Sequence, residues 1–153
     1  MFKQAIPDSV RLPVLTFRLG DRPYALLIED VVEVTAMVEA TPIPDAGPEL
    51  IGMVNRRGMI LPLLDLRVLF RQPASVVNSQ SVFIVAQGGD RQIGLVVDEI
   101  RQVDYVDALQ MSDAPATSRY IHGLISHKDE MIAVVALPPL LTAYLSGDVE
   151  QLE

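Results

Sequence analysis

The chain contains an internal repeat, and this repeat restricts the fold more than any other feature of the sequence. Residues 20–34, GDRPYALLIEDVVEV, align without a gap with residues 89–103, GDRQIGLVVDEIRQV, so that a turn, an apolar strand and an acidic pair coincide. Residues 52–70 align in a similar way with residues 123–141, through a glycine, a polar turn and a long apolar run. Because these segments alternate along the chain, we expect two similar small β units.

Three β-hairpins are predicted from apolar stretches that flank short polar turns. They cover residues 15–28 with a turn at Gly20-Asp21, residues 82–97 with a turn at 87–90, and residues 121–137 with a turn at 127–130. Closing each β unit into a barrel would leave no exposed strand edge. Pro62, inside the apolar run 59–64, cannot donate a ladder hydrogen bond and therefore favours an edge strand or a barrel corner.

Only short helices are expected. A spacing of 3.6 residues occurs over residues 30–34 and 138–144, and Pro138 and Pro139 suit the first turn of the second helix. The polar start of the chain and its acidic end are expected to fray around an ordered part of about residues 12–145. The length suits one mostly β domain, or two small subdomains that share one core.

The composition narrows the classes of function. The 153 residues include no cysteine, which excludes disulfides, thiolate metal ligands and cysteine nucleophiles. The formal net charge is −8, so the chain would repel a nucleic acid, whereas a protein partner is compatible with this charge. No apolar run approaches the roughly 20 residues that span a bilayer, and we expect a cytoplasmic protein without membrane insertion.

The sequence offers no arrangement of residues that is typical of catalysis or metal binding. The two histidines, His122 and His127, are expected to point to opposite faces of one hairpin arm. The adjacent carboxylates at 29–30 and 98–99 should diverge, and we expect each pair to cap exposed amides where a strand passes into a short helical turn. We therefore predict no enzyme activity, no metal and no cofactor.

Two interpretations of Asn55-Arg56-Arg57-Gly58 remain open from the residues alone. The segment can be a hairpin turn in which Asn55 and Gly58 relax the backbone and both arginines face solvent. Alternatively, Arg57 lies between two barrels at the start of the next strand and is held rigidly enough to bind carboxylates or carbonyls of a partner protein.

Four sequence blocks, in this order, resemble the CheW family of chemotaxis coupling proteins over about residues 12–145. The blocks are V-x-E-V at 31–34, G-x-x-N-x-R-G-x-I-x-P-x-x-D-L at 52–66, G-L-V-V-D-E-I at 94–100 and Y-I-x-G at 120–123. The resemblance implies one CheW-like domain over residues 1–153, built from two intertwined five-stranded SH3-like β-barrels with short helices. It also implies a non-catalytic adaptor that joins the regulatory domain of a CheA-type histidine kinase to the cytoplasmic tips of chemoreceptors in a membrane-associated array.

The resemblance assigns roles to individual residues. Asn55 and Arg57 would lie in a groove between the barrels that receives the receptor, and Arg56 would add a charge beside it. Further partner contacts would involve a surface that includes Val31, Glu33 and Val34. The positions expected to maintain turns and the fold are Gly52, Gly58, Pro62, Asp65, Gly94, Asp98 and Gly123, with Asp65 capping the turn before Leu66.

Some features leave alternatives open. Ala136, Pro138 and Pro139 replace an acidic, helix-starting sequence often seen in the family, so the contacts made by this end are not fixed by the resemblance. A CheW-like scaffold of a related pathway that controls pili or surface sensing is one alternative. A small-ligand-binding β-barrel is another, and it would need polar side chains that converge in a cavity.

Overall fold

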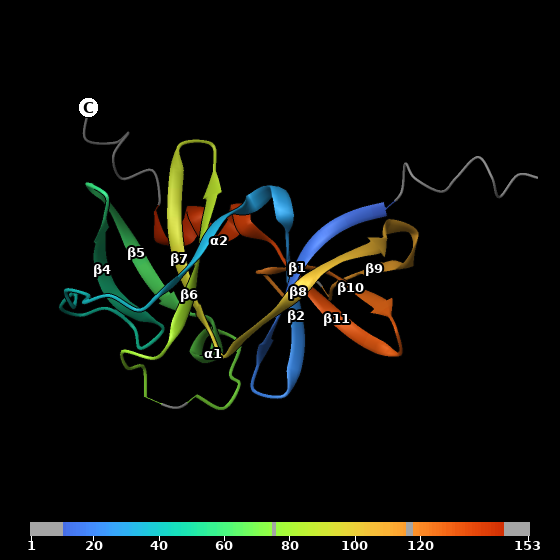
Figure 1. Ribbon diagram of the computed structural model, residues 1–153, viewed down its shortest axis with the longest axis horizontal. Helices are drawn as coiled ribbons and strands as arrows, with labels where there is room; N and C mark the ends of the chain where they lie inside the picture. Colours follow the sequence, from blue (N-terminus) through green and yellow to red (C-terminus); the bar gives the residue numbers. More distant parts are fainter. Residues whose placement is uncertain (1–10, 75, 116–117, 146–153) are drawn as a thin grey trace, which may run out of the picture.

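The protein consists mainly of two β-sheets that lie side by side (Figure 1). The computed structural model describes residues 11–74, 76–115 and 118–145. The strands in these residues are β1 (Arg11–Leu19), β2 (Arg22–Leu27), β3 (Val31–Ala36), β4 (Leu50–Arg56), β5 (Met59–Asp65), β6 (Val82–Gly88), β7 (Arg91–Val97), β8 (Glu99–Asp107), β9 (Met111–Asp113), β10 (Ile121–His127) and β11 (Glu130–Val135). The mostly β class and the three predicted hairpins, β1–β2, β6–β7 and β10–β11, are confirmed.

The two halves of the chain exchange strands. One sheet has the order β3-β6-β7-β5-β4, and the other has the order β8-β1-β2-β11-β10-β9. Each sheet thus takes its first hairpin from one repeat and the following strand and second hairpin from the other repeat. The internal repeat is therefore a structural repeat, and its copies are intertwined rather than placed one after the other.

The junction between the copies has the same register in both sheets. β5 runs parallel to β7 with Leu63 opposite Gly94, and β11 runs parallel to β2 with Val134 opposite Ala25. A Cβ atom at Gly94 would lie 2.9 Å from Leu63 Cδ1, so only a very small residue fits this side of the junction. The expected structural role of Gly94 therefore corresponds to close packing between strands.

The sheets differ by one strand from the five-stranded pair that was expected. β9 adds a sixth strand to one sheet by pairing with β10, with Ser112 opposite Leu124. In the other sheet the corresponding contact is a single bridge between Thr41 and Met53. In both contacts the backbone of the added segment packs directly against a glycine. A Cβ atom at Gly52 would collide with the carbonyl oxygen of Thr41, and one at Gly123 would lie 2.6 Å from the carbonyl oxygen of Ser112.

Alternating side chains of the same strands serve different cores. On β6, Phe83 and Val85 point into the five-stranded barrel, whereas Ile84 and Ala86 point into a core shared by the two sheets. The shared core also receives Phe17 and residues of both repeats, all buried. Strands with both faces buried read as continuous apolar runs, which explains why the aliphatic segments show so little alternation.

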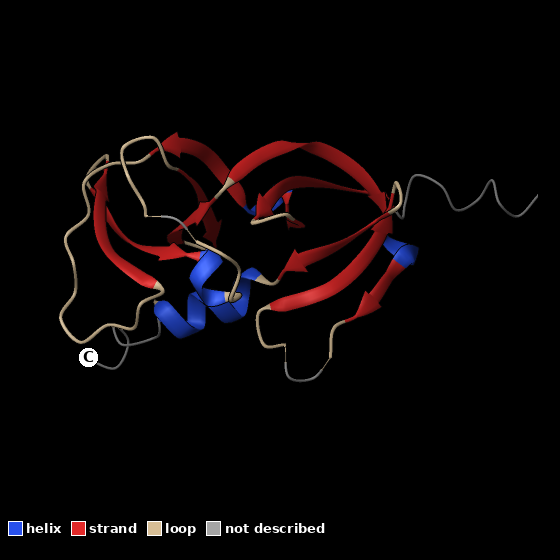
Figure 2. Ribbon diagram, turned by 90° about the horizontal axis from the view of Figure 1, so that it is seen from below, coloured by secondary structure: helices blue, strands red, loops and turns tan. Residues whose placement is uncertain are grey.

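Helices are short, and α1 (Leu66–Leu69) and α2 (Leu137–Tyr144) lie near the junction of the sheets, as the view from below shows (Figure 2). The 3₁₀ turns are η3 (Ile28–Asp30) and η4 (Ala108–Gln110). The helix predicted at 138–144 is confirmed, with prolines at its first positions. In the described part of the chain no helix has both the length and the apolar character needed to cross a membrane.

One local prediction is wrong, and a second is narrowed. Residues 30–34 do not form a helix: η3 ends at Asp30, and the following residues pair with β6 as strand β3, because the ladder hydrogen bonds of a sheet outweigh a weak helical spacing. Of the two places predicted for Pro62, an edge strand or a barrel corner, the edge strand is excluded, since β5 lies between β7 and β4. The pairing of β5 with β7 begins at Leu63, one residue later, so Pro62 does not interrupt that ladder.

Candidate protein-interaction site

The candidate site is built on the turn between β4 and β5. Arg57 and Gly58 form this two-residue turn with φ angles of 55° and 82°, the backbone of a type I′ hairpin. Asn55 Oδ1 accepts a hydrogen bond from the Gly58 N–H at 3.0 Å and fixes the turn. The expected turn roles of Asn55 and Gly58 are therefore confirmed.

Arg57 occupies a backbone conformation that disfavours any residue other than glycine. A positive φ at a residue with a Cβ costs roughly 1 kcal/mol, and a hairpin turn of this type usually carries Asn or Gly here. The side chain is 75% exposed, so burial does not offset this cost. The geometry of the two-residue turn therefore imposes this conformation on Arg57, as it does on Lys128 in the β10–β11 hairpin.

Arg56 and Glu33 close the five-stranded sheet. β3 and β4 are the two edges of this sheet, and Arg56 Nε donates to Glu33 Oε2 at 2.6 Å across the gap between them. The Arg56 side chain is only 14% exposed, and Arg57 reaches the other carboxylate oxygen more loosely, at 3.6 Å. Arg56 therefore holds the barrel together, and Arg57 remains the outward-facing cation of the pair.

The two arginines lower the pKa of Glu33. The hydrogen bond from Arg56 has the largest effect, and the charges of Arg56 and Arg57 add to it, while partial desolvation acts in the opposite direction. Glu33 is consequently a carboxylate throughout the neutral range, and the site carries one acidic and two basic groups.

Replacing Glu33 with glutamine is expected to lower the melting temperature at pH 7 and to have much less effect at pH 3. The pKa of Glu33 is lower in the folded than in the unfolded chain, so its stabilising contribution is present above about pH 4.3 and is lost as the pH falls through the folded value. Thermal melts of wild type and Glu33→Gln at both pH values test this. The exposed Glu39 provides a matched control, Glu39→Gln, and an equal effect of both variants would contradict the assignment.

Exposed apolar side chains flank the charged cluster. They are Val32 and Val34 on β3 and Met59 and Ile60 on β5. Met59 lies opposite Arg56 in the β4–β5 ladder, and Ile60 lies opposite Asn55. Large apolar groups that surround a cation at the surface are typical of protein-interaction sites.

The surface predicted on β3 differs in one residue from the observed one. Val31 packs partly against the shared core, whereas Val32 is exposed together with Val34. A β-bulge between Val31 and Glu33 shifts the alternation of side chains, and the sequence pattern does not reveal it. Val32, Met59 and Ile60 were not predicted as site residues. The only indication of Met59 and Ile60 in the sequence is that two apolar residues directly follow the turn.

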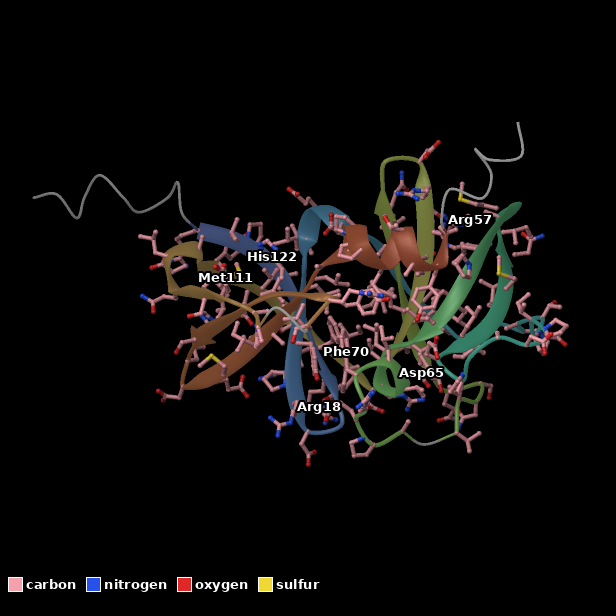
Figure 3. The ribbon with its side chains drawn as sticks, turned by 180° about the vertical axis from the view of Figure 1, so that it is seen from behind. Arg18, Arg57, Asp65, Phe70, Met111 and His122 are labelled. Carbon is pink, nitrogen blue, oxygen red and sulfur yellow. The ribbon has the colours of Figure 1, made fainter. Side chains whose placement is uncertain are left out.

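The expectation that Arg57 lies between the two barrels is not met. Figure 3 shows Arg57 at the end of the molecule distant from Met111, and the ion pair that it forms is with a residue of its own sheet. The reason is the two-residue turn, which projects from the end of the β4–β5 hairpin rather than lying against the shared core.

A second charged cluster consists of the buried Arg67 and Asp65 and the more exposed Asp98, which lies just before β8. The Arg67 guanidinium contacts both Asp65 oxygens at 2.9 and 3.0 Å and Asp98 Oδ1 at 3.0 Å, and the side chain is 3% exposed. Asp98 also accepts a hydrogen bond from the backbone N–H of Gly20 at 2.6 Å. Asp65 caps α1 by accepting from the Arg67 N–H, which confirms its predicted role. The carboxylates raise the pKa of Arg67, chiefly through the hydrogen bonds to Asp65.

The expected capping role of the paired carboxylates is confirmed only in part: Asp98 caps the Gly20 amide, and Glu29 and Asp30 lie in the first turn of η3, but in neither pair does a side chain cap a helix. The residue after Asp98 begins β8, and Glu99 pairs with Arg18 at 2.6 Å rather than facing a helix. Glu29 and Asp30 lie inside η3, whose first residue has no side-chain cap. Burial, with a smaller contribution from Glu29, raises the pKa of Asp30. Helix starts were predicted at these acids because carboxylate side chains commonly cap the N-terminus of a helix.

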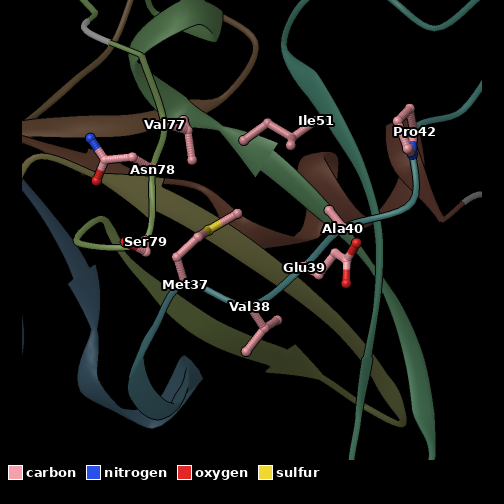
Figure 4. A pocket seen from close by; sticks show the side chains of 9 residues that line it. All are labelled: Met37, Val38, Glu39, Ala40, Pro42, Ile51, Val77, Asn78 and Ser79. Atoms are coloured by element: carbon pink, nitrogen blue, oxygen red, sulfur yellow. The ribbon is translucent and has the colours of Figure 1, made fainter.

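Two pockets with mostly apolar linings lie beside the sheets, and two more polar hollows lie around the β1–β2 turn. One of about 410 Å³ opens beside the five-stranded barrel, and its nine lining residues include one charged side chain, Glu39 (Figure 4). Another of about 380 Å³ is lined by η3, His122 and the start of α2, including Ala136, Pro138 and Pro139. Among the described residues, no cluster of three His, Cys, Asp or Glu side chains could hold a metal. The second pocket also has Glu29 and Asp30 in its lining, and both pockets lie outside the hydrophobic cores rather than inside a barrel, as a ligand-binding barrel would require.

The chain is similar to proteins of one family along almost its whole length. The model of the CheW-like domain matches residues 13–144. A chemotaxis protein CheW of Klebsiella aerogenes is 31% identical over 89% of this chain and 85% of its own, and Protein PilI of Pseudomonas aeruginosa is 29% identical over 74% and 66%. The crystal structure of the scaffolding protein TtCheW from Thermoanaerobacter tengcongensis superimposes with a TM-score of 0.75 at 27% identity, covering 82% of this chain and 88% of that one. The strand-exchanged fold and these matches together show that the chain belongs to the CheW-like domain family.

Proposed function

We propose that this protein is a non-catalytic adaptor of bacterial chemotaxis that couples chemoreceptors to a CheA-type histidine kinase. The match of the CheW-like domain to residues 13–144 carries this proposal, because it covers both barrels and the shared core. The geometry agrees with it: the charged and apolar groups of the candidate site lie on an outer surface, where they suit a protein partner better than a small substrate.

The roles within the proposed receptor site follow from the contacts. Arg57 contacts the cytoplasmic tip of the receptor, since its guanidinium is exposed and suited to carboxylates and carbonyl groups. Asn55 sets the turn that presents Arg57, and Arg56 secures the turn to β3 through Glu33. Val34 and Val32 extend the same surface with apolar area, and we assign further partner contacts to β3, which also carries Glu33 and the half-buried Val31.

The adaptor acts in the cytoplasm, at the membrane-associated receptor array, as one component of a ring or lattice. It needs no cofactor, because the contacts proposed for it are protein–protein contacts. Its net charge of −8 and sequence pI near 4.6 disfavour nucleic acid. The coupling of receptor to kinase then depends on the relative positions of the surfaces that bind them, which the shared core holds together.

The match to Protein PilI favours a second candidate within the same class. In that case the protein is a CheW-like scaffold of a related pathway, with an output in pili or surface sensing, and the candidate site has the same role. The fold is common to both candidates, so the partners distinguish them.

An affinity experiment with identified partners tests the proposal. The purified protein is immobilised, exposed to lysate of the source cell, and the retained proteins are identified by mass spectrometry. We expect a histidine kinase and a chemoreceptor, and the genes that neighbour the retained kinase separate flagellar chemotaxis from the second candidate. Retention of neither protein, tested also with the purified kinase regulatory domain, would overturn the adaptor function.

A further inference from the structure

The six-stranded barrel has its own version of the hairpin that carries Arg56 and Arg57. Its turn is formed by Lys128 and Asp129, with φ angles of 51° and 64°, so the backbone repeats that of the first hairpin. In the alignment of the two repeats, Lys128 corresponds to Arg57, and His127 corresponds to Arg56. His127 thus occupies, in the six-stranded barrel, the position at which Arg56 closes the five-stranded barrel.

His127 faces a carboxylate across the closure of its barrel. Asp104 lies on the edge strand β8, and its Oδ1 is 3.8 Å from Nε2 of His127 on β10. The two side chains are 13% and 19% exposed, and His127 Nε2 is buried without a hydrogen-bond partner in the described residues. The distance exceeds that of a hydrogen bond, so the two groups face each other without being hydrogen-bonded.

Asp104 is already oriented toward the histidine. Gln102 Nε2 donates to its two carboxylate oxygens at 3.1 and 3.2 Å, and the Thr16 hydroxyl lies 3.4 Å from Oδ2. Gln102 on β8 corresponds in the repeat to Glu33 on β3. The carboxylate of the six-stranded barrel, Asp104, therefore lies two residues after the position that aligns with Glu33. The carboxylate therefore has a fixed position and an acceptor oxygen available for one more donor.

Other charged groups surround His127. Lys128 Nζ lies 3.9 Å from Asp104 Oδ1 but is 71% exposed. Glu130 lies opposite His127 in the ladder and pairs with Arg101 at 3.1 Å, and Asp129 occupies the exposed turn. Carboxylates, lysine and arginine titrate outside pH 5–8, whereas histidine changes its charge within this range.

We propose that His127 and Asp104 form a pH-sensitive closure of the six-stranded barrel. In the protonated imidazole both ring nitrogens are donors, and its positive charge faces the Asp104 carboxylate, so the seam between β8 and β10 tightens in mild acid. The stabilising contact belongs to the protonated imidazole and is lost as the pH rises. The Arg56–Glu33 closure of the other barrel stays charged across the same range, so the two barrels respond differently.

Amide hydrogen exchange at pH 5.5 and pH 8.0, corrected for intrinsic exchange rates, tests the proposal. In the wild type we expect protection of β9 and β10 to be about fivefold higher at the lower pH, and protection of β3 and β4 to be unchanged. His127→Gln and Asp104→Asn should each remove the difference. His122→Gln removes the other, exposed histidine and should leave it intact.

A fourth variant, His127→Arg, copies the arginine of the first repeat and should give high protection at both pH values. The proposal is overturned if the pH difference persists in His127→Gln, if His122→Gln abolishes it, or if β3 and β4 change in parallel with β9 and β10. Because His127→Gln and Asp104→Asn remove opposite partners, the result does not depend on the folding of any single variant.

Discussion

Replacing Arg67 with alanine is expected to lower the free energy of unfolding by about 3–5 kcal/mol, the typical cost of breaking a buried ion pair from one side. The guanidinium is buried between Asp65 and Asp98, and it joins the start of α1 to the loop before β8. Without it, Asp65 keeps its hydrogen bond to the α1 backbone but is left as a buried carboxylate without a counter-ion. Urea denaturation at pH 7 measures the loss.

The exposed Arg71 offers a matched control four residues further along the chain. Arg71→Ala should change the free energy of unfolding by less than about 0.5 kcal/mol, as is usual for surface substitutions. A similar small effect of Arg67→Ala would show that the carboxylates find other partners or water, and that the cluster does not hold the start of α1 and the loop before β8 together.

Reversing the charge of Arg57 is expected to lower receptor affinity by about tenfold or more while the fold is retained. The side chain is mostly exposed and its contact with Glu33 is loose, so Arg57→Glu should alter stability by no more than about 1 kcal/mol. A truncated interface arginine commonly costs more than 1 kcal/mol of binding energy, and a reversed charge adds repulsion. Binding of a purified receptor cytoplasmic fragment, measured by calorimetry, gives the affinity.

The repeat supplies the control for this experiment. Lys128→Glu makes the same charge change at the corresponding turn of the other barrel, with nearly the same exposure and backbone conformation. It should leave receptor affinity unchanged. Arg57→Gly separates side chain from backbone, because it relieves the positive φ and should stabilise the hairpin while still weakening binding. Equal losses in Arg57→Glu and Lys128→Glu would mean that overall charge, not this site, governs binding.

Patterns that depend on neighbouring residues were predictable from the sequence. The hairpin turns, the start of α2 at two prolines and the capping role of Asp65 are all determined within a few residues. The alignment of the repeats also predicted two related β units. The resemblance to the CheW family then supplied the intertwined arrangement, which no local pattern contains.

Features that depend on contacts between distant segments were not predictable. The bulge that exposes Val32 arises from pairing with β6, and the role of Arg67 arises because Asp98 approaches it from another loop. Arg56 could be read as a surface charge until the structure placed Glu33 beside it. The position of Arg57 at the tip of a projecting turn likewise depends on how the sheet ends, which the turn residues do not specify.

The exchange of strands between the two repeats has a consequence for how the protein is made. β1 precedes β8 by about 80 residues, yet the two strands pair, so Val14 can reach its ladder partner Asp104 only after most of the described chain has been made. Its hairpin partner β2 likewise pairs with β11, close to the end of the described chain. The first barrel to be completed during synthesis is thus the inner one, β3 to β7, while the opening hairpin stays without its outer strands. Contacts that span so much of the chain are slow to form, and the newly made hairpin exposes apolar side chains during that delay.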